Sequence, residues 1–130
     1  MNIKTKKRPK PQIAEEELLS EIISAIQDKK GQKIVSLDLS SIPEAITDHF
    51  VICEASARIQ VKAIVENIIE KTRQTTGEIP WHKEGLENLE WVLIDYISVV
   101  VHVFLSRSRE YYQLEELWAD AELIKYDDSY

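Results

Sequence analysis

At 130 residues, the chain is long enough for one hydrophobic core and too short for two domains. A composition of 44% hydrophobic and 30% charged residues is that of a globular protein and excludes a chain disordered throughout. No apolar run approaches the roughly 20 residues of a membrane-spanning helix, and the first residues do not resemble a secretory signal, so we expect no membrane partner.

The charge is divided unevenly along the sequence. Five of the 16 basic residues lie within residues 1–13, which hold no acid, so the remainder has 11 basic against 23 acidic residues, a net charge of −12. We predict that residues 1–13 form a disordered basic arm and that residues 14–130 form one folded domain. Phosphate backbones repel an acidic domain, so we expect a basic protein partner, no DNA contact, and RNA contact at most through the arm.

The first half of the domain predicts two helices and two strands. A helix is expected over residues 14–30, closed by Lys29, Lys30 and Gly31, and its apolar residues recur at helical spacing: Leu18, Leu19, Ile22, Ile23 and Ile26. Alternation predicts strands over residues 33–39 and 49–54. Ser56 is the expected N-cap of a helix over residues 57–75, which ends before Gly77 and whose core-facing stripe is Val61, Ile64, Val65 and Ile68.

The second half predicts a hairpin followed by a helix. Strands over residues 90–95 and 98–105 are joined by a turn around Tyr96 and Ile97. The second strand is apolar at nearly every position, which is typical of a central strand covered on both faces. A helix capped by Ser108 is expected over residues 109–119, and Leu123 and Ile124 predict a last short strand. The order of elements predicts a single-domain α/β fold, a mixed β-sheet flanked by helices.

The sequence carries no motif that predicts catalysis. It lacks a dinucleotide-binding fingerprint, a P-loop, a nucleophile elbow and paired metal-binding cysteines, and it has only 3 glycines for a phosphate loop. The single cysteine, Cys53, is expected to be a packed thiol in a reducing cytosol. A zinc site is only weakly indicated, because its candidate ligands share no i, i+4 spacing: His82, Glu84, Asp95 and His102. We therefore expect no catalytic residue, metal or cofactor.

His102 interrupts the apolar second strand of the hairpin and shares a face with Val100 and Phe104 by alternation. Two interpretations remain open, because both satisfy the rule that buried polar groups are paired. His102 is either a buried ring hydrogen-bonded to a neighbour, with Asp95 across the hairpin as a candidate, or a polar contact in an interface.

Trp91, Leu93 and Asp95 share one face of the first strand of the hairpin. Tryptophan and tyrosine concentrate at binding hot spots, so Trp91 is a candidate contact residue, and packing under a helix is the competing interpretation. For Tyr111 and Trp118, packing under a helix is the favoured interpretation.

Several segments share a recognisable pattern that covers roughly residues 18–120. They read Asp-His-Phe-Val-Ile at residues 48–52, Pro-Trp-His-Lys-Glu-Gly at 80–85, Glu-Trp-Val-Leu-Ile-Asp-Tyr at 90–96 and Val-Val-Val-His-Val-Phe at 99–104. Arg109, Tyr112 and Leu-Glu-Glu-Leu-Trp-Ala-Asp at residues 114–120 follow them. In combination, these segments resemble the ribosomal silencing factors, also called the Iojap family.

The resemblance implies a nucleotidyltransferase-like core without catalytic motifs. It also implies binding to the fourteenth protein of the large ribosomal subunit, which blocks joining of the small subunit and lowers translation when nutrients are scarce. The family pattern and the shared strand face predict a partner-binding patch of Glu84, Trp91, Asp95, His102, Phe104, Arg109 and Tyr112. The expected location is the cytoplasm, or an organellar stroma or matrix in a eukaryote, and a homodimer of the free chain is plausible.

Two positions depart from the family pattern. A Gly-Asp turn usually follows the residue matched by Asp95, where this chain has Tyr96-Ile97-Ser98, and Glu54-Ala55 stand where a glycine precedes the helix. A nucleotidyltransferase-like enzyme is the alternative function, but it needs a Gly-Ser loop and paired carboxylates holding magnesium. The junction here has no glycine, and Asp95 has no Asp-x-Asp partner. A self-associating scaffold without a ribosomal role is the third hypothesis.

Overall fold

The computed structural model describes residues 12–128 and residue 130. In chain order, its helices and strands are α1 (Gln12–Asp28), β1 (Gln32–Asp38), β2 (His49–Ala55), α2 (Arg58–Thr76), β3 (His82–Glu84), β4 (Trp91–Asp95), β5 (Val99–Leu105), α3 (Ser106–Tyr112), α4 (Leu114–Leu117) and β6 (Glu122–Lys125). The expected basic arm over residues 1–13 lies almost wholly outside the described residues, and α1 begins at its end.

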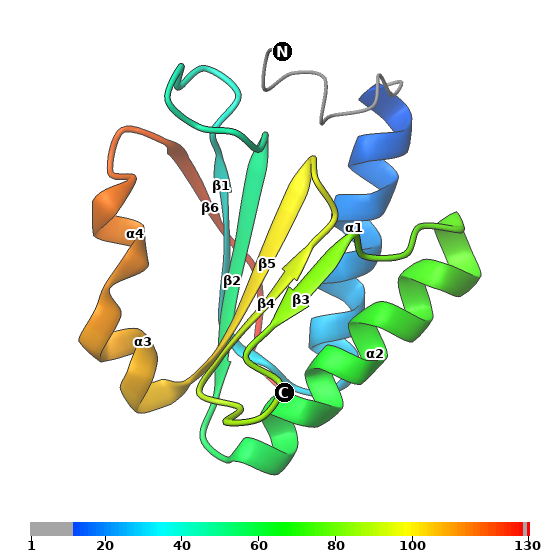
Figure 1. The fold of residues 1–130 in the computed structure, drawn as a ribbon, viewed down its shortest axis with the longest axis vertical. Helices are drawn as coiled ribbons and strands as arrows, with labels where there is room; N and C mark the ends of the chain where they lie inside the picture. Colours follow the sequence, from blue (N-terminus) through cyan, green and yellow to red (C-terminus); the bar gives the residue numbers. More distant parts are fainter. Residues whose placement is uncertain (1–11, 129) are drawn as a thin grey trace.

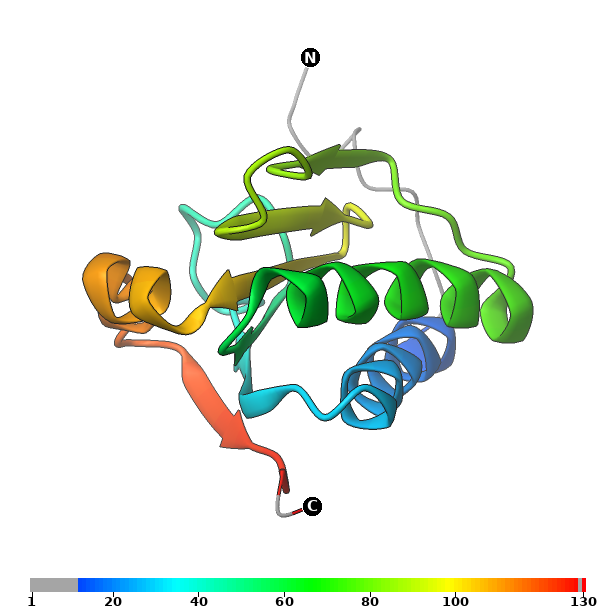
Figure 2. The same ribbon diagram turned by 90° about the horizontal axis from the view of Figure 1, so that it is seen from below.

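One mixed sheet holds the six described strands in the order β3-β4-β5-β2-β1-β6. β2 and β5 pair in parallel, and the other neighbouring pairs are antiparallel. The helices α1 and α2 lie on one side of the sheet and α3 and α4 on the other, as Figures 1 and 2 show from two directions. The predicted α/β fold with a mixed sheet flanked by helices is therefore confirmed. None of the described helices is long and apolar enough to cross a bilayer.

The larger hydrophobic core lies between the sheet and the α1–α2 pair. The predicted stripe of α2 is buried at all four positions, and the α1 residues Leu18, Ile22, Ile23 and Ile26 pack into the same core. Leu19 is only partly buried at its margin. β5 is buried at every position, which confirms that it is a central strand covered on both faces. Each buried aliphatic side chain of this kind contributes about 1.5–3 kcal/mol, so this core fixes the sheet in place.

A smaller core lies on the opposite face of the sheet, which we call the second face. Its buried members are Val35, Leu37, Leu39, Ile52, Phe104 and Leu114, and partly buried aromatic residues, including Phe50, Trp91 and Trp118, pack against it. The helices over this face are short, because α3 has 7 residues and α4 has 4. The second face is therefore covered only in part.

The predicted single helix over residues 109–119 is wrong in its extent, because the helix is interrupted at Gln113. This residue has a left-handed backbone, with φ at 50°, and separates α3 from α4. The break buries Leu114 in the smaller core and leaves Tyr111 81% exposed, so the expected packing of Tyr111 under a helix is also wrong. Trp118 does pack, half-buried, against the smaller core.

Two predicted helix caps are also wrong. Ala57, not Ser56, occupies the N-cap position of α2, and no side chain caps that helix. Ser108 lies inside α3, whose N-cap position is Leu105 at the end of β5. The C-terminal prediction for α2 is confirmed, since Gly77 adopts the left-handed conformation with φ at 75°.

β3 was not predicted from the sequence, and His82 is its first residue. Its three residues are all exposed, so they carry no apolar alternation. Gly85 follows β3 with φ at 85°, and a Cβ there would lie 2.1 Å from the carbonyl oxygen of Trp91. Glycine therefore lets the connection pass directly beside β4.

The predicted hairpin of β4 and β5 and the last strand, β6, are both present. Ile97 in the hairpin turn has φ at 75°, a conformation that β-branched residues rarely adopt. Its N–H donates to Oδ1 of Asp95 at 2.7 Å, which holds the turn. The departure from the family's Gly-Asp turn therefore places a strained residue at the hairpin end.

Candidate partner-binding face

Four of the seven predicted patch residues meet on the second face. The ring of Trp91 on β4 lies 4.9 Å from that of Phe104 on β5 and 4.7 Å from that of Tyr112 on α3. The ring of His102 lies 6.0 Å from that of Trp91. We call Trp91, His102, Phe104 and Tyr112 the aromatic cluster. Since Phe104 and His102 are buried and Tyr112 is 49% exposed, the cluster offers Tyr112 and part of Trp91 to the surface.

His102 is a buried ring paired with a neighbour, and that neighbour is Trp91. The Nε1–H of Trp91 donates to Nδ1 of His102 at 3.0 Å, which places the histidine proton on Nε2. Burial lowers the pKa of His102 to about 3, so the ring is neutral at physiological pH. The suggested hydrogen bond between His102 and Asp95 is absent, because the Asp95 carboxylate accepts a hydrogen bond from the backbone N–H of Ile97 instead.

Nε2 of His102 has no hydrogen-bond partner among the described residues. The imidazole ring instead lies 4.6 Å from the ring of Phe50 on β2, at an interplanar angle of 71°. His102 therefore connects the aromatic cluster on β4 and β5 to the central strand β2.

An apolar groove lies between the aromatic cluster and the loop that joins β1 to β2. It has a volume of about 370 Å³, and its apolar lining includes Leu39, Phe50, Leu93, Val100 and Trp118. Two carboxylates, Glu44 and Asp95, also line it, together with the neutral ring of His102, and no lysine or arginine of the described residues does. The groove therefore suits an apolar group that is accompanied by positive charge.

The sequence analysis missed several residues of this face. The rings of Phe50 and Trp118 lie 5.8 Å apart in the lining of the groove, which also includes Ile46, 56% exposed. Trp81, which is 61% exposed, lies next to the groove. Alternation along β2 could have placed Phe50 and Ile52 on one face. Their position beside the hairpin depends on the pairing of β2 with β5, which one sequence does not reveal.

Two other predicted patch residues lie at the edge of the second face. Glu84 is on the exposed edge strand β3, where its carboxylate lies 2.7 Å from Nε2 of His82. Asp95 is at the end of β4, opposite His82 in the strand register, and it lines the groove. These residues surround the aromatic cluster rather than belong to it.

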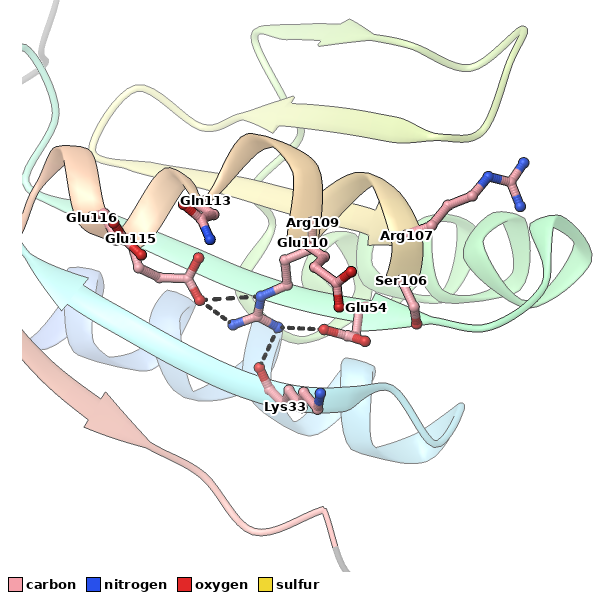
Figure 3. A pocket seen from close by; sticks show the side chains of 9 residues that line it. All are labelled: Lys33, Glu54, Ser106, Arg107, Arg109, Glu110, Gln113, Glu115 and Glu116. Atoms are coloured by element: carbon pink, nitrogen blue, oxygen red, sulfur yellow. Dashed lines mark hydrogen bonds and ion pairs between the residues drawn. The ribbon is translucent and has the colours of Figure 1, made fainter.

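Arg109 lies over the second face but outside the aromatic cluster, because it bonds Glu54, which shares a strand face with Ile52. It is 8% exposed at the base of α3, where its guanidinium bonds Glu54, Glu115 and the carbonyl oxygen of Lys33. These groups line a polar pocket with a volume of about 540 Å³, shown in Figure 3. Arg109 is buried in this network, and its contact with a partner stays a prediction.

The described residues do not assemble a metal-binding cluster. No three His, Cys, Asp or Glu side chains in the described part of the chain lie close enough to hold a metal ion, and Nδ1 of His102 accepts a hydrogen bond from Trp91. The Cys53 thiol is fully buried, and desolvation raises its pKa to about 12, far from that of a nucleophile.

Comparisons with known proteins identify the family. The family model described as "Ribosomal silencing factor during starvation" matches residues 11–129. A protein of Halalkalibacterium halodurans named Ribosomal silencing factor RsfS is 40% identical over 113 residues, which are 87% of this chain and 95% of the relative. A crystal structure of a Chromobacterium violaceum protein matches with a TM-score of 0.75 and 35% identity, covering 80% of this chain and 85% of that one.

A Mus musculus relative is named Mitochondrial assembly of ribosomal large subunit protein 1. It is 28% identical over 110 residues, which are 82% of this chain and 46% of that protein. The family model and the bacterial relatives cover nearly the whole described domain. The chain belongs to the ribosomal silencing factor family.

Proposed function

We propose that the chain binds the large ribosomal subunit through the fourteenth protein of that subunit and sterically blocks joining of the small subunit. Translation is thereby repressed when nutrients are limiting. The observation that carries the proposal is a half-open aromatic and apolar surface on a member of the ribosomal silencing factor family. We define the docking face as the aromatic cluster, the adjoining groove, Trp81 and Ile46.

The docking face has the composition of a protein-binding surface. Tryptophan and tyrosine dominate binding hot spots because each buries a large apolar area with few rotatable bonds. Tyr112, Trp81 and Ile46 supply exposed area, and the groove supplies a pocket for an apolar side chain of the partner. Exposed apolar side chains gathered in this way mark interaction sites on soluble domains.

Charge supports a basic partner. Residues 14–130 carry 11 basic and 23 acidic residues, and the charged residues that line the groove, Glu44 and Asp95, are both acidic. An acidic surface attracts a basic ribosomal protein and is repelled by the phosphates of ribosomal RNA. The complex is therefore expected to form through protein on protein, with RNA contact only through the basic arm of residues 1–13.

Steric occlusion requires no chemistry at the site. The bacterial relative is named as a silencing factor, and the mouse relative as a factor in large-subunit assembly, so neither name describes an enzyme. We therefore propose a non-catalytic regulator that acts in the cytoplasm, or in the stroma or matrix of an organelle. When free, two copies can pair through the same apolar face to form a homodimer that the ribosomal partner displaces.

Sucrose-gradient co-sedimentation tests the proposal. The protein is mixed with purified large subunits, small subunits or assembled ribosomes, and we expect it to migrate with free large subunits alone. Tyr112→Ala is expected to weaken this binding about 30-fold, because loss of a hot-spot side chain costs about 2 kcal/mol. Ile59→Ala is the matched control, because Ile59 is 79% exposed on α2, on the other side of the sheet.

Two results would contradict the proposal. Absence of co-sedimentation with large subunits at low salt, where charge attraction is strongest, would refute the ribosomal function. Equal binding by wild type, Tyr112→Ala and Trp81→Ala, with all three proteins folded, would place the contact surface elsewhere.

A further inference from the structure

Arg109 is the most extensively bonded charged side chain of the second face's helices. Its Nε and Nη2 donate to one oxygen of Glu115 at 3.1 and 2.6 Å, and its Nη1 donates to the carbonyl of Lys33 at 2.6 Å and to Glu54 at 3.3 Å. Figure 3 shows the guanidinium between these three groups. We call Arg109, Glu115, Glu54 and the Lys33 carbonyl the Arg109 network.

The three acceptors come from three separate elements, β1, β2 and α4. Lys33 lies at an irregularity in β1, where the register shifts between Gln32 and Val35 and Lys33 itself has φ at 51°. Such a bulge frees a carbonyl from the regular ladder, and here that carbonyl faces Arg109. Glu54 lies near the end of β2, only 6% exposed. The network therefore anchors α3 to the adjacent strands β1 and β2.

The third acceptor crosses the break between α3 and α4. Gln113 interrupts the helix, and its backbone N–H donates to the carbonyl oxygen of Arg109 at 2.9 Å. Glu115 lies on α4, beyond that break, so its bond to the guanidinium fixes the orientation of α4 relative to α3. Two charge-assisted N–H···O bonds to one carboxylate oxygen are stronger than hydrogen bonds between neutral groups, which suits this role.

An aromatic residue of the docking face lies at the end of each short helix. Tyr112 is the last residue of α3, and Trp118 directly follows α4. Tyr112 lies three residues after Arg109 on α3 and contacts Trp91 on one side of the face. Trp118 lies three residues after Glu115, and its backbone N–H donates to the carbonyl oxygen of Glu115 at 3.3 Å. Its ring packs against Phe50 at the groove. The network therefore joins the two short helices that are adjacent in the chain to both aromatic residues.

We infer that Arg109 is a positioning residue of the docking face, which acts through Tyr112 and Trp118 and does not touch the partner. The expected effect of Arg109 on partner binding rests on the proposed function. Its expected effect on the positions of Tyr112 and Trp118 rests on the hydrogen bonds alone. Lysine cannot replace Arg109, because an ammonium group lacks the planar fork that reaches three acceptors at fixed angles.

Fluorine NMR of the full chain labelled with 5-fluorotryptophan tests the structural step. The chain has 3 tryptophans, and single Trp→Phe substitutions assign their resonances. Arg109→Met and Glu115→Ala are expected to shift the resonances of Trp91 and Trp118 and to leave that of Trp81, which is remote from the network, unchanged. The matched controls, Arg107→Met on the same helix and Glu116→Ala in the same pocket, are expected to shift none.

Binding to purified large subunits tests the second step. Arg109→Met, Arg109→Lys and Glu115→Ala are each expected to bind about 10-fold more weakly, and the two controls to bind as wild type does. Arg109→Met leaves the carboxylate of Glu54 buried without its partner, so it can unfold the domain. Glu115→Ala then decides, because it cuts the link across the helix break and keeps the bonds to Glu54 and Lys33.

Three outcomes are informative. Unchanged Trp91 and Trp118 resonances in folded Glu115→Ala would overturn the inference. Shifted resonances with unchanged subunit binding would also overturn it, since the rings would then not serve the docking face. If wild type itself does not bind large subunits, the proposed function fails, and the resonances still decide whether Arg109 positions the two aromatic rings.

Discussion

His102 makes the stability of the fold depend on pH, and one substitution isolates its contribution. In the native protein, burial lowers the pKa of His102 to about 3. In the unfolded chain a histidine has a pKa of about 6.5. Between these values the unfolded chain binds a proton that the native protein does not bind, so the free energy of unfolding decreases as the pH decreases. The full contribution is present above about pH 6.5 and is lost progressively toward about pH 3.

The size of the effect follows from the two pKa values. Each pKa unit corresponds to about 1.4 kcal/mol, so this one group lowers the free energy of unfolding by about 2 kcal/mol between pH 7.5 and pH 5.0. Urea denaturation at both pH values measures the change. In His102→Asn, an amide oxygen stands near the position of Nδ1 and can still accept from Trp91, but the side chain does not titrate.

Because the other titrating groups are common to both proteins, the difference between wild type and His102→Asn isolates His102. We expect wild type to lose about 2 kcal/mol more than the variant between the two pH values. Equal losses would show that His102 titrates in the native protein as it does in the unfolded chain. That result would refute its burial as a neutral ring bonded to Trp91.

Three further predictions concern single positions. Ile97→Gly is expected to raise the free energy of unfolding by about 1 kcal/mol in urea denaturation, because glycine adopts a positive φ without strain; no gain would show an unstrained turn. Gly85→Ala is expected to cost about 2 kcal/mol or more, because its Cβ collides with the backbone of Trp91, whereas Gly77→Ala, with open space around it, costs about 1 kcal/mol; equal losses would exclude the collision. Cys53, whose pKa burial raises to about 12, is expected to react with a thiol reagent only on unfolding, and rapid reaction of the native protein would contradict its burial.

The fold class was predictable because its elements carry strong periodic signals. The α2 stripe from Val61 to Ile68 repeats at helical spacing, and it is buried as expected. The apolar run of β5 indicated a central strand, and the structure covers β5 on both faces. In these elements, burial of one face requires the periodicity that is visible in the sequence.

The breaks and edges of the fold were not predictable, because tertiary contacts decide them. Gln113 adopts a left-handed backbone although nothing in its residue type requires one, and the burial of Leu114 and the Arg109–Glu115 pair favour that geometry. β3 is three exposed residues whose strand conformation depends on pairing with β4 and on the close approach at Gly85. The local conformational preferences of these residues predict neither the Arg109–Glu115 pair nor the pairing of β3 with β4.

For the candidate site, alternation was sufficient within the hairpin and insufficient beyond it. It placed Trp91 on one face of β4, and His102 together with Phe104 on one face of β5. The register of the hairpin puts these residues on the same face of the sheet. It gave no indication that Phe50 on β2 would stand against His102, because that depends on strand order. For Arg109, the family pattern suggested a partner contact. In the structure, two acceptors distant in the sequence, the Lys33 carbonyl and Glu54, converge on it together with Glu115, and it is buried.

Subunit joining measured by light scattering tests the central claim most directly. Large subunits are premixed with the protein at increasing ratios, and small subunits are then added in magnesium that supports joining. We predict that the scattering increase falls as the protein approaches one copy per large subunit, and that Tyr112→Ala requires a large excess for the same effect. Undiminished joining, at a protein concentration where co-sedimentation shows the large subunits to be occupied, would contradict the account.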